Sequence, residues 1–318
     1  MTEISHRTIQ TNGINMHVAE AGSGPLVLLV HGFPESWYSW RHQLPALAAA
    51  GYHAVAPDVR GYGRTDAPQP IEAYSMRNMV ADMAGVLDAL GAETAVIVGH
   101  DWGAPIAWNS AVLRPERYRA VAGLSVPFLQ RSPMPPTQLF KLAFKDNFFY
   151  ILYFQEPGVA EADLEADPRR SMRLFLFAAS GDAPQDPLTW QKPKTSTFLA
   201  GMPEPEHLPA WLTEADLDYF AAEFARTGFR GGLNRYRNMD RDWEEIPELA
   251  GAKVTQPAIF IAGERDGVIA MNPAGVTAMK ETVPNLRQTL LLPGAGHWTQ
   301  QERPAEVNAA LIEFLKGL

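Results

Sequence analysis

The run Thr94-Ala-Val-Ile-Val98, followed at once by Gly99-His100-Asp101-Trp102-Gly103, decides the fold. Small and β-branched apolar residues in a row predict a buried parallel strand, and the apolar segment from Ala104 predicts a helix. A sharp turn from strand to helix holds its central residue in a strained conformation at the mouth of a pocket. Glycines on both sides let the strand and the helix approach closely. The pattern predicts a nucleophile elbow with Asp101 at its centre.

Asp101 stands where such an elbow usually carries serine. An aspartate with an unperturbed pKa of about 3.9 is ionised at neutral pH, so it needs no base before it attacks. Displacement of a leaving group from an alkyl carbon would give an ester, and a histidine would then be needed to activate the water that cleaves it. The alternative interpretation is a helix N-cap, the commonest reason for aspartate directly before a helix.

A second predicted strand, Leu26–Val30, runs into the turn His31-Gly32-Phe33-Pro34. In an α/β-hydrolase architecture the loop after this strand supplies one backbone N–H of the oxyanion hole, and the residue after the nucleophile supplies the other. Those donors would be Phe33 and Trp102. Pro34 cannot donate and fixes the turn, and we expect a cis peptide bond before it. Taken alone, the string fits an ordinary turn equally well.

An acid and a histidine follow two further predicted strands. The apolar run Pro257–Ala262 precedes a loop with Asp266, and Leu290–Leu292 precedes a loop with His297. The order nucleophile, acid, base is typical of α/β-hydrolase proteins. We predict that Asp266 orients the imidazole and that His297 is the general base. Glu264 competes as the acid because it lies in the same loop, but the residue nearer the outer end of that loop reaches the pocket more easily.

Two other acids, Asp58 and Asp66, lie in a stretch with glycines and arginines. We interpret them as structural, and we expect ion pairs with the neighbouring arginines to stabilise this turn.

Taken together, these strings resemble the epoxide hydrolases of the α/β-hydrolase fold, close in pattern to the soluble epoxide hydrolases. The resemblance covers essentially all 318 residues. It implies an α/β fold with a mostly parallel sheet, helices on both faces and an inserted helical cap. Residues 1–128 and 251–318 would form the α/β-hydrolase core, and residues 129–250 the cap, or lid.

The cap carries the residues that would distinguish this family from its neighbours. The segment Phe148–Gly158 resembles the first cap-tyrosine motif of the family and places Tyr150 at the catalytic position. Asn234-Arg-Tyr-Arg-Asn238 resembles the second, with Tyr236. A phenol with an unperturbed pKa of about 10 stays protonated at neutral pH, so both could donate to the epoxide oxygen. Simple packing is the alternative for each, and it is the interpretation that we favour for Tyr153.

The resemblance implies hydrolysis of a hydrophobic epoxide to a vicinal diol through an ester on Asp101, with water as the second reactant and with no metal or organic cofactor. The side chains expected to border the substrate are Trp102, Phe33, Pro34 and, if it is not simply packed, Tyr153. Apolar residues of the cap could line a channel to them: Phe140, Phe144, Phe148, Phe149, Trp190 and Phe198.

Two other functions remain open at this point. A haloalkane dehalogenase would use the same Asp101 and hold the halide with donors such as the Trp102 indole. Such enzymes usually need a second side-chain donor, often asparagine after the His-Gly pair, which Phe33 cannot supply. A haloacid dehalogenase would need arginines beside the nucleophile, and Trp102 and Ala104 offer none. A binding protein that keeps the pocket without turnover belongs to another class.

Composition excludes several partners. Lys and Arg total 27 against 36 Asp and Glu, a net charge of −9, which argues against nucleic acid or an anionic membrane surface as the main partner. With no cysteine there is no disulfide framework, thiolate zinc site or cysteine nucleophile. The N-terminus lacks the layout of a secretory signal, so we expect a cytoplasmic protein. A homo-oligomer is left open.

Local patterns complete the prediction. The helical period is clear over Arg77–Leu90, and Asn12-Gly13 between two short alternating runs predicts an antiparallel hairpin at Thr8–Gln10 and Asn15–Glu20. The proline-rich segment Ala183–Pro209 predicts a long loop between two cap helices.

Overall fold

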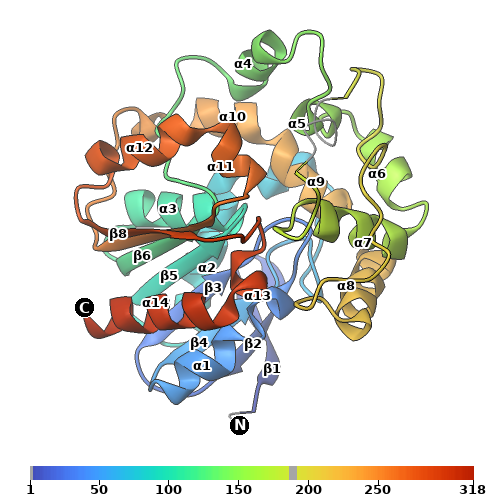
Figure 1. The fold of residues 1–318 in the computed structure, drawn as a ribbon. Helices are drawn as coiled ribbons and strands as arrows, with labels where there is room; N and C mark the ends of the chain where they lie inside the picture. The colour runs from blue at the N-terminus through green and yellow to red at the C-terminus, as the bar shows by residue number, and fades with distance from the viewer. Residues whose placement is uncertain (1–2, 186–191) are drawn as a thin grey trace.

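The computed structural model describes residues 3–185 and 192–318. Its centre is an eight-stranded sheet in the order β1-β2-β4-β3-β5-β6-β7-β8 (Figure 1). Strands β1 and β2 pair with each other antiparallel, β2 is antiparallel to β4, and the remaining neighbours are parallel. The strand bounds are β1 Ser5–Thr11, β2 Ile14–Ala21, β3 Leu26–Val30, β4 His53–Pro57, β5 Ala95–His100, β6 Tyr118–Leu124, β7 Ala258–Gly263 and β8 Leu286–Leu292.

Helices cover both faces of this sheet and crowd one end of it. Those before β6 are η1 Trp37–Trp40, α1 Gln43–Ala49, η2 Ile71–Tyr74, α2 Met76–Ala89 and α3 Gly103–Leu113. Those described between β6 and β7 are α4 Pro136–Ala143, α5 Tyr150–Tyr153, α6 Val159–Leu164, α7 Pro168–Ala178, α8 Glu214–Thr227, α9 Arg230–Arg237, α10 Met239–Glu245 and η4 Pro247–Leu249. The last are α11 Gly267–Met271, α12 Pro273–Thr282, α13 Thr299–Glu302 and α14 Pro304–Lys316.

Alternation along the central strands divides the interior into two apolar layers. Successive side chains of a strand point to opposite faces, so Leu26, Leu28 and Val30 of β3 join one cluster while Val27 and Leu29 join the other. Helices α1 and α14 cover the second face, and α2 and α3 cover the first. Figure 1 shows α14 and α1 below the sheet and α3 and α12 above it. The expected α/β fold, with a mostly parallel sheet and helices on both faces, is confirmed.

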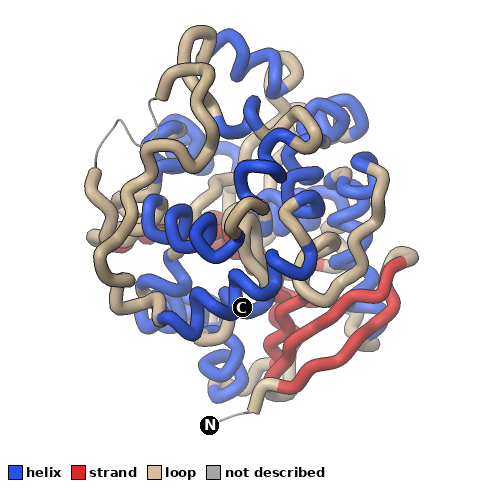
Figure 2. The backbone as a smooth tube through the Cα atoms, turned by 90° about the vertical axis from the view of Figure 1, so that its right-hand side faces the viewer, coloured by secondary structure: helices blue, strands red, loops and turns tan. Residues whose placement is uncertain are grey.

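The opening hairpin forms as predicted. Its strands are joined by Asn12 and Gly13, both with positive φ, and Thr11 pairs with Ile14. Two successive left-handed residues match the two-residue turn that fits the twist of paired strands. The hairpin forms one edge of the sheet, where its long strands stand out in Figure 2.

The turn after β4 corrects one expectation. Asp58 and Asp66 are structural, but their partners are mostly not arginine side chains. Asp58 accepts backbone hydrogen bonds from Trp37 at 2.9 Å and Arg64 at 3.0 Å. Arg60 instead pairs with Asp82 of α2. Backbone N–H groups therefore hold much of this turn, because a buried carboxylate can satisfy several of them at once.

Between β6 and β7 the described residues contribute helices but no strand to the sheet. Helices α5 to α9 lie at the end of the sheet where the parallel strands finish, at the right of Figure 1. The expected loop Ala183–Pro209 falls within a longer connection from α7 to α8. Part of it, including Trp190, lies outside the described residues.

Candidate active site

The elbow has the strained geometry that its sequence predicts. Asp101 follows β5 directly and has φ +49°, a left-handed conformation that is unusual for a residue with a side chain. The neighbouring glycines make this turn possible by close packing. A Cβ on Gly99 would lie 1.9 Å from the carbonyl oxygen of Gly103, and one on Gly103 would lie 2.0 Å from that of Val30. Helix α3 therefore packs against β3 and β5 at a distance that only glycine allows.

Substituting Gly103 by alanine is expected to destabilise the protein by about 1–3 kcal/mol, because the added methyl group must push α3 away from β3. Urea unfolding followed by circular dichroism measures the change in the free energy of unfolding. Gly267→Ala is the matched control, since nothing lies within 4 Å of its added Cβ and its φ is not positive. Equal stability of the two variants would contradict the close-approach argument.

Asp101, His297 and Asp266 meet at the carboxyl ends of three different strands. His297 Nε2 lies 3.3 Å from Asp101 Oδ2, and its Nδ1 lies 3.1 Å from both oxygens of Asp266. Glu264, the competing acid, is exposed, and its side chain accepts a hydrogen bond from Gly294 instead. Of the two acids in this loop, Asp266 is the one that touches the imidazole.

Electrostatics at this triad favour a charged imidazole in the free protein. Burial opposes charge on Asp266, but the nearby His297 lowers the pKa of its carboxyl below the ordinary value. Burial also opposes charge on His297, and by itself it would lower the pKa of the imidazole. The charge of Asp266 and the hydrogen bond to Asp101 outweigh it and raise that pKa well above 6.5. Both carboxylates therefore favour the protonated form of His297 when no substrate is bound.

Backbone donors surround the carboxylate of Asp101. The N–H of Phe33 donates to Asp101 Oδ1 at 2.7 Å. The N–H of Trp102 lies beside it: a Cβ on Gly32 would come within 2.3 Å of Asp101 Oδ1 and 2.6 Å of the Trp102 nitrogen. The peptide bond between Phe33 and Pro34 is cis, as expected. The two predicted oxyanion donors thus lie at one end of the nucleophile's side chain.

Two buried residues that the sequence prediction did not include join the three site loops. Glu35 accepts hydrogen bonds from the N–H of Gly32 at 2.9 Å and from His100 Nδ1 at 2.8 Å. His100 Nε2 lies 2.8 Å from the carbonyl oxygen of His297. An oxygen acceptor therefore faces each of the two ring nitrogens of His100. The available signals were the proximity in sequence of His100 to Asp101 and of Glu35 to the turn that ends at Pro34.

Two tyrosines from the segment between β6 and β7 lie beside the residues that flank the nucleophile. Tyr236 of α9 has its ring 5.1 Å from the Trp102 ring and 5.5 Å from that of Phe33, centre to centre. Tyr150, the first residue of α5, lies 6.1 Å from Tyr236 by the same measure. Burial, and next the charge of Asp101, raise the pKa of both phenols. Both therefore keep their protons throughout the neutral range.

Tyr153 does not join this group. Its ring packs against Phe148 and Phe154, and burial together with Asp163 raises its pKa to about 12. No contact described in the structure joins it to Asp101. These contacts fit packing for Tyr153, and its place among the substrate-bordering residues stays a prediction.

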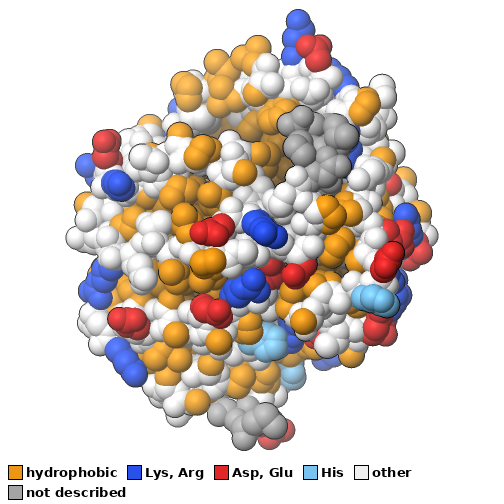
Figure 3. Space-filling model, in the orientation of Figure 1, with side chains coloured by type: hydrophobic (Ala, Val, Ile, Leu, Met, Phe, Trp, Pro, Cys, Tyr) orange, Lys and Arg blue, Asp and Glu red, His pale blue; other side chains and the backbone are white. Residues whose placement is uncertain are grey.

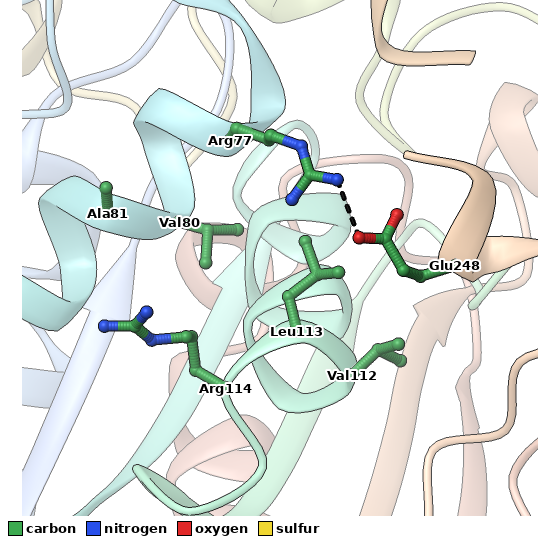
Figure 4. A pocket seen from close by; sticks show the side chains of 7 residues that line it. All are labelled: Arg77, Val80, Ala81, Val112, Leu113, Arg114 and Glu248. Atoms are coloured by element: carbon green, nitrogen blue, oxygen red, sulfur yellow. Dashed lines mark hydrogen bonds and ion pairs between the residues drawn. The ribbon is translucent and has the colours of Figure 1, made fainter. Parts of the chain in front are cut away.

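Other features of the described residues do not supply the side chains that the predicted reaction needs. Within residues 3–185 and 192–318, no cluster of three or more His, Cys, Asp or Glu side chains could hold a metal ion. No helix in the same ranges is both long and apolar enough to cross a membrane. A surface hollow of about 270 Å³ is lined by Arg77, Val80, Ala81, Val112, Leu113, Arg114 and Glu248 (Figure 4). None of the predicted catalytic residues lines it, and the Arg77–Glu248 ion pair at its side is half exposed.

Comparison with known proteins identifies the family. Residues 25–304 match the family model described as alpha/beta hydrolase fold. The chain is 50% identical to epoxide hydrolase A of Mycobacterium tuberculosis, covering 99% of this chain and 98% of that protein. It is 44% identical to epoxide hydrolase 2 of Siraitia grosvenorii, covering 99% of each. The crystal structure of epoxide hydrolase A from Mycobacterium thermoresistibile matches with a TM-score of 0.95 at 54% identity, over 99% of both chains. This chain therefore belongs to the epoxide hydrolases of the α/β-hydrolase fold.

Proposed function

We propose that this epoxide hydrolase opens an apolar epoxide to a vicinal diol in two steps at Asp101. The observation that carries the proposal is the position of Asp101. Its carboxylate lies between the backbone N–H of Phe33 and the imidazole of His297, and the charge of that carboxylate raises the pKa of both Tyr150 and Tyr236. Nucleophile, base and two proton donors thus share one small space.

In the first step, one oxygen of Asp101 attacks a ring carbon and the carbon–oxygen bond of the epoxide breaks. The departing oxygen carries developing negative charge, so a hydrogen-bonded phenol stabilises the transition state and then gives its proton. Tyr150 and Tyr236 are assigned this role. The products of the step are an alkyl ester on Asp101 and one tyrosinate.

In the second step, His297 removes a proton from water, and the hydroxide attacks the ester carbonyl carbon. Phe33 and Trp102 stabilise the resulting oxyanion through their N–H groups. Collapse breaks the bond between the ester carbonyl carbon and the alkyl oxygen, and that oxygen takes the proton from His297. The tyrosinate has by then taken up the proton that His297 carried in the free enzyme. Asp101 is left protonated, and transfer of this proton to His297 restores the starting state. The sum is the addition of one water molecule.

The loss of charge at Asp101 when the ester forms would switch His297 from the protonated to the neutral imidazole. In the free enzyme the hydrogen bond to Asp101 helps to raise the pKa of His297. Formation of the ester neutralises that carboxylate and removes this cause. The imidazole can then give its proton to the tyrosinate and act as the base, while Asp266 keeps it oriented. Formation of the ester at Asp101 therefore prepares His297 for the hydrolysis of that ester.

We assign residues 129–250 as the cap and infer an apolar substrate from its lining. Phe140 and Phe144 both pack against Phe149, and the rings of Phe144 and Phe149 stack at 4.0 Å. Figure 3 shows hydrophobic side chains around a hollow in the upper part of the molecule, over α4 and α5. Phe198 contacts Tyr150 directly. Apolar side chains around two phenols suit a small epoxide that needs polar contacts only at its oxygen.

His297→Gln tests the reaction class. Attack by Asp101 remains possible in this variant, but the water is not activated, so the ester is expected to accumulate. Intact mass spectrometry after exposure to styrene oxide should show a gain equal to the whole epoxide, and peptide mapping should place it on Asp101. The wild-type protein, treated in the same way, is the control.

A parallel sample is exposed to 1-bromohexane. A gain equal to the haloalkane minus hydrogen bromide, with no epoxide adduct, would instead indicate dehalogenase chemistry at Asp101. An adduct on any other residue would contradict the assignment of the nucleophile.

A further inference from the structure

Glu302, at the end of α13, is a buried carboxylate that the two reaction steps do not use. It is 5% exposed and accepts three backbone hydrogen bonds. Its Oε2 receives the N–H of Gly296 at 2.8 Å and that of Gly181 at 2.9 Å, and its Oε1 receives the N–H of Trp298 at 3.0 Å. The acceptor therefore binds the residue before and the residue after His297.

The third donor, Gly181, belongs to the cap segment that follows α7. The same segment meets the histidine loop at two further points: His297 N donates to the carbonyl of Ala179 at 2.8 Å, and Trp298 Nε1 donates to that of Leu176 at 2.7 Å. A Cβ on Gly296 would lie 2.3 Å from the nitrogen of Gly181. The loop with the base and the end of α7 are thus in direct backbone contact, and the Glu302 carboxylate is shared between them.

Helix capping explains only part of this arrangement. The bond from Trp298 N to Glu302 lies at the start of the single turn of α13, where an acceptor satisfies a free N–H. Gly181 and Gly296 lie outside that turn, so their bonds to Oε2 serve no helix end. An acceptor with both oxygens in use fixes the backbone on each side of His297 and sets where Nε2 points.

We propose that Glu302 is a positioning residue for the hydrolytic step, joining the cap to the loop that carries the base. It rests on the role assigned above to His297. No described hydrogen bond or ion pair links Glu302 to Asp101, Tyr150 or Tyr236, so formation of the ester does not depend on it. The effect of losing Glu302 is therefore confined to the step in which the imidazole must face the ester-attacking water.

Glu302→Gln tests this step assignment. Glutamine has the same length but one acceptor oxygen, and its amide group would face an N–H that it cannot accept. We expect hydrolysis of the ester to slow by about 10- to 100-fold, because displacing a catalytic group by about 1 Å lowers the rate by up to about 100-fold. Ester formation should keep its wild-type rate. Quenched-flow mass spectrometry with styrene oxide measures both, and the ester should accumulate on Asp101 during turnover.

Glu302→Asp keeps both oxygens on a shorter side chain, so its hydrolysis rate should fall less than that of the glutamine variant. It also carries the test if the glutamine variant does not fold. Asp82→Asn is the control for a purely structural effect. Asp82, on α2, is also a buried carboxylate, but its partner is Arg60 and not the histidine loop. This control should lower the melting temperature without accumulation of ester.

The outcomes separate this proposal from the mechanism on which it rests. Ester accumulation in both His297→Gln and Glu302→Gln supports the positioning role. Accumulation in His297→Gln alone, with both rates of Glu302→Gln unchanged or lowered together, overturns it and leaves the base assignment in place. If His297→Gln forms ester that still turns over at the wild-type rate, the base assignment itself is wrong.

Discussion

Asp101→Asn is expected to abolish epoxide hydrolysis, lowering kcat by roughly 10⁴-fold or more, as the loss of a nucleophile does in other covalent enzymes. The neutral amide is a poor nucleophile toward an alkyl carbon, while the donors around it remain in place. Steady-state diol formation measures the loss. Intact mass at the end of the assay verifies that asparagine persists, since water activated by His297 could convert the amide back to aspartate.

The same variant should lower the pKa of His297. In the free enzyme that pKa is raised by Asp266 and by the contact with Asp101, and the asparagine removes the second cause. Because the pKa of His297 is higher in the folded than in the unfolded protein, its protonation stabilises the fold. This stabilisation is complete at a pH below the unfolded-state pKa and is lost as the pH rises through the folded-state pKa. Titration of the imidazole by NMR in both proteins tests the shift. An unchanged His297 pKa would contradict the proposed charge coupling.

Residues close to a sequence motif could be assigned without a structure, because local geometry determines their place. The flanking glycines and the strand before Asp101 define the elbow within ten residues, and Phe33 follows its own strand directly. Choosing Asp266 over Glu264 was also possible, since position in a single loop decides which acid reaches inward. In each case the residues that decide the assignment are close to it in the sequence.

Contacts across the fold were beyond such reasoning. The partner of Arg60 proved to be Asp82 rather than Asp58, and Glu35 meets His100 from 65 residues away. The full length of β8 was also hidden, because Arg287, Gln288 and Thr289 of this edge strand are exposed and break the apolar pattern. These particular contacts over a long sequence separation carry no periodic or motif signal, unlike the order of nucleophile, acid and base along the chain.

Replacing both Tyr150 and Tyr236 by phenylalanine is expected to slow ester formation by about 10⁴-fold, and either single change by about 10²-fold. Each variant keeps the ring and its packing but loses a donor to the epoxide oxygen. One remaining phenol can still protonate that oxygen, whereas without both it departs as a bare alkoxide. Single-turnover measurement with a hydrophobic epoxide isolates this step from hydrolysis.

Tyr153→Phe is the matched control for this pair, because it removes the same hydroxyl group three residues from Tyr150 at a side chain that packs toward Asp163. Its rate of ester formation should equal that of the wild-type protein. A large loss there, or full activity in the double variant, would mean that the proton comes from another group.

A phenol must share the space of the nucleophile to protonate the oxygen that the nucleophile displaces. Burial and the charge of Asp101 raise the pKa of both Tyr150 and Tyr236, whereas Asp101 does not contribute to the raised pKa of Tyr153. Burial and the charge of Asp101 also raise the pKa of Tyr62, so Tyr62 is the phenol to which full activity of the double variant would point.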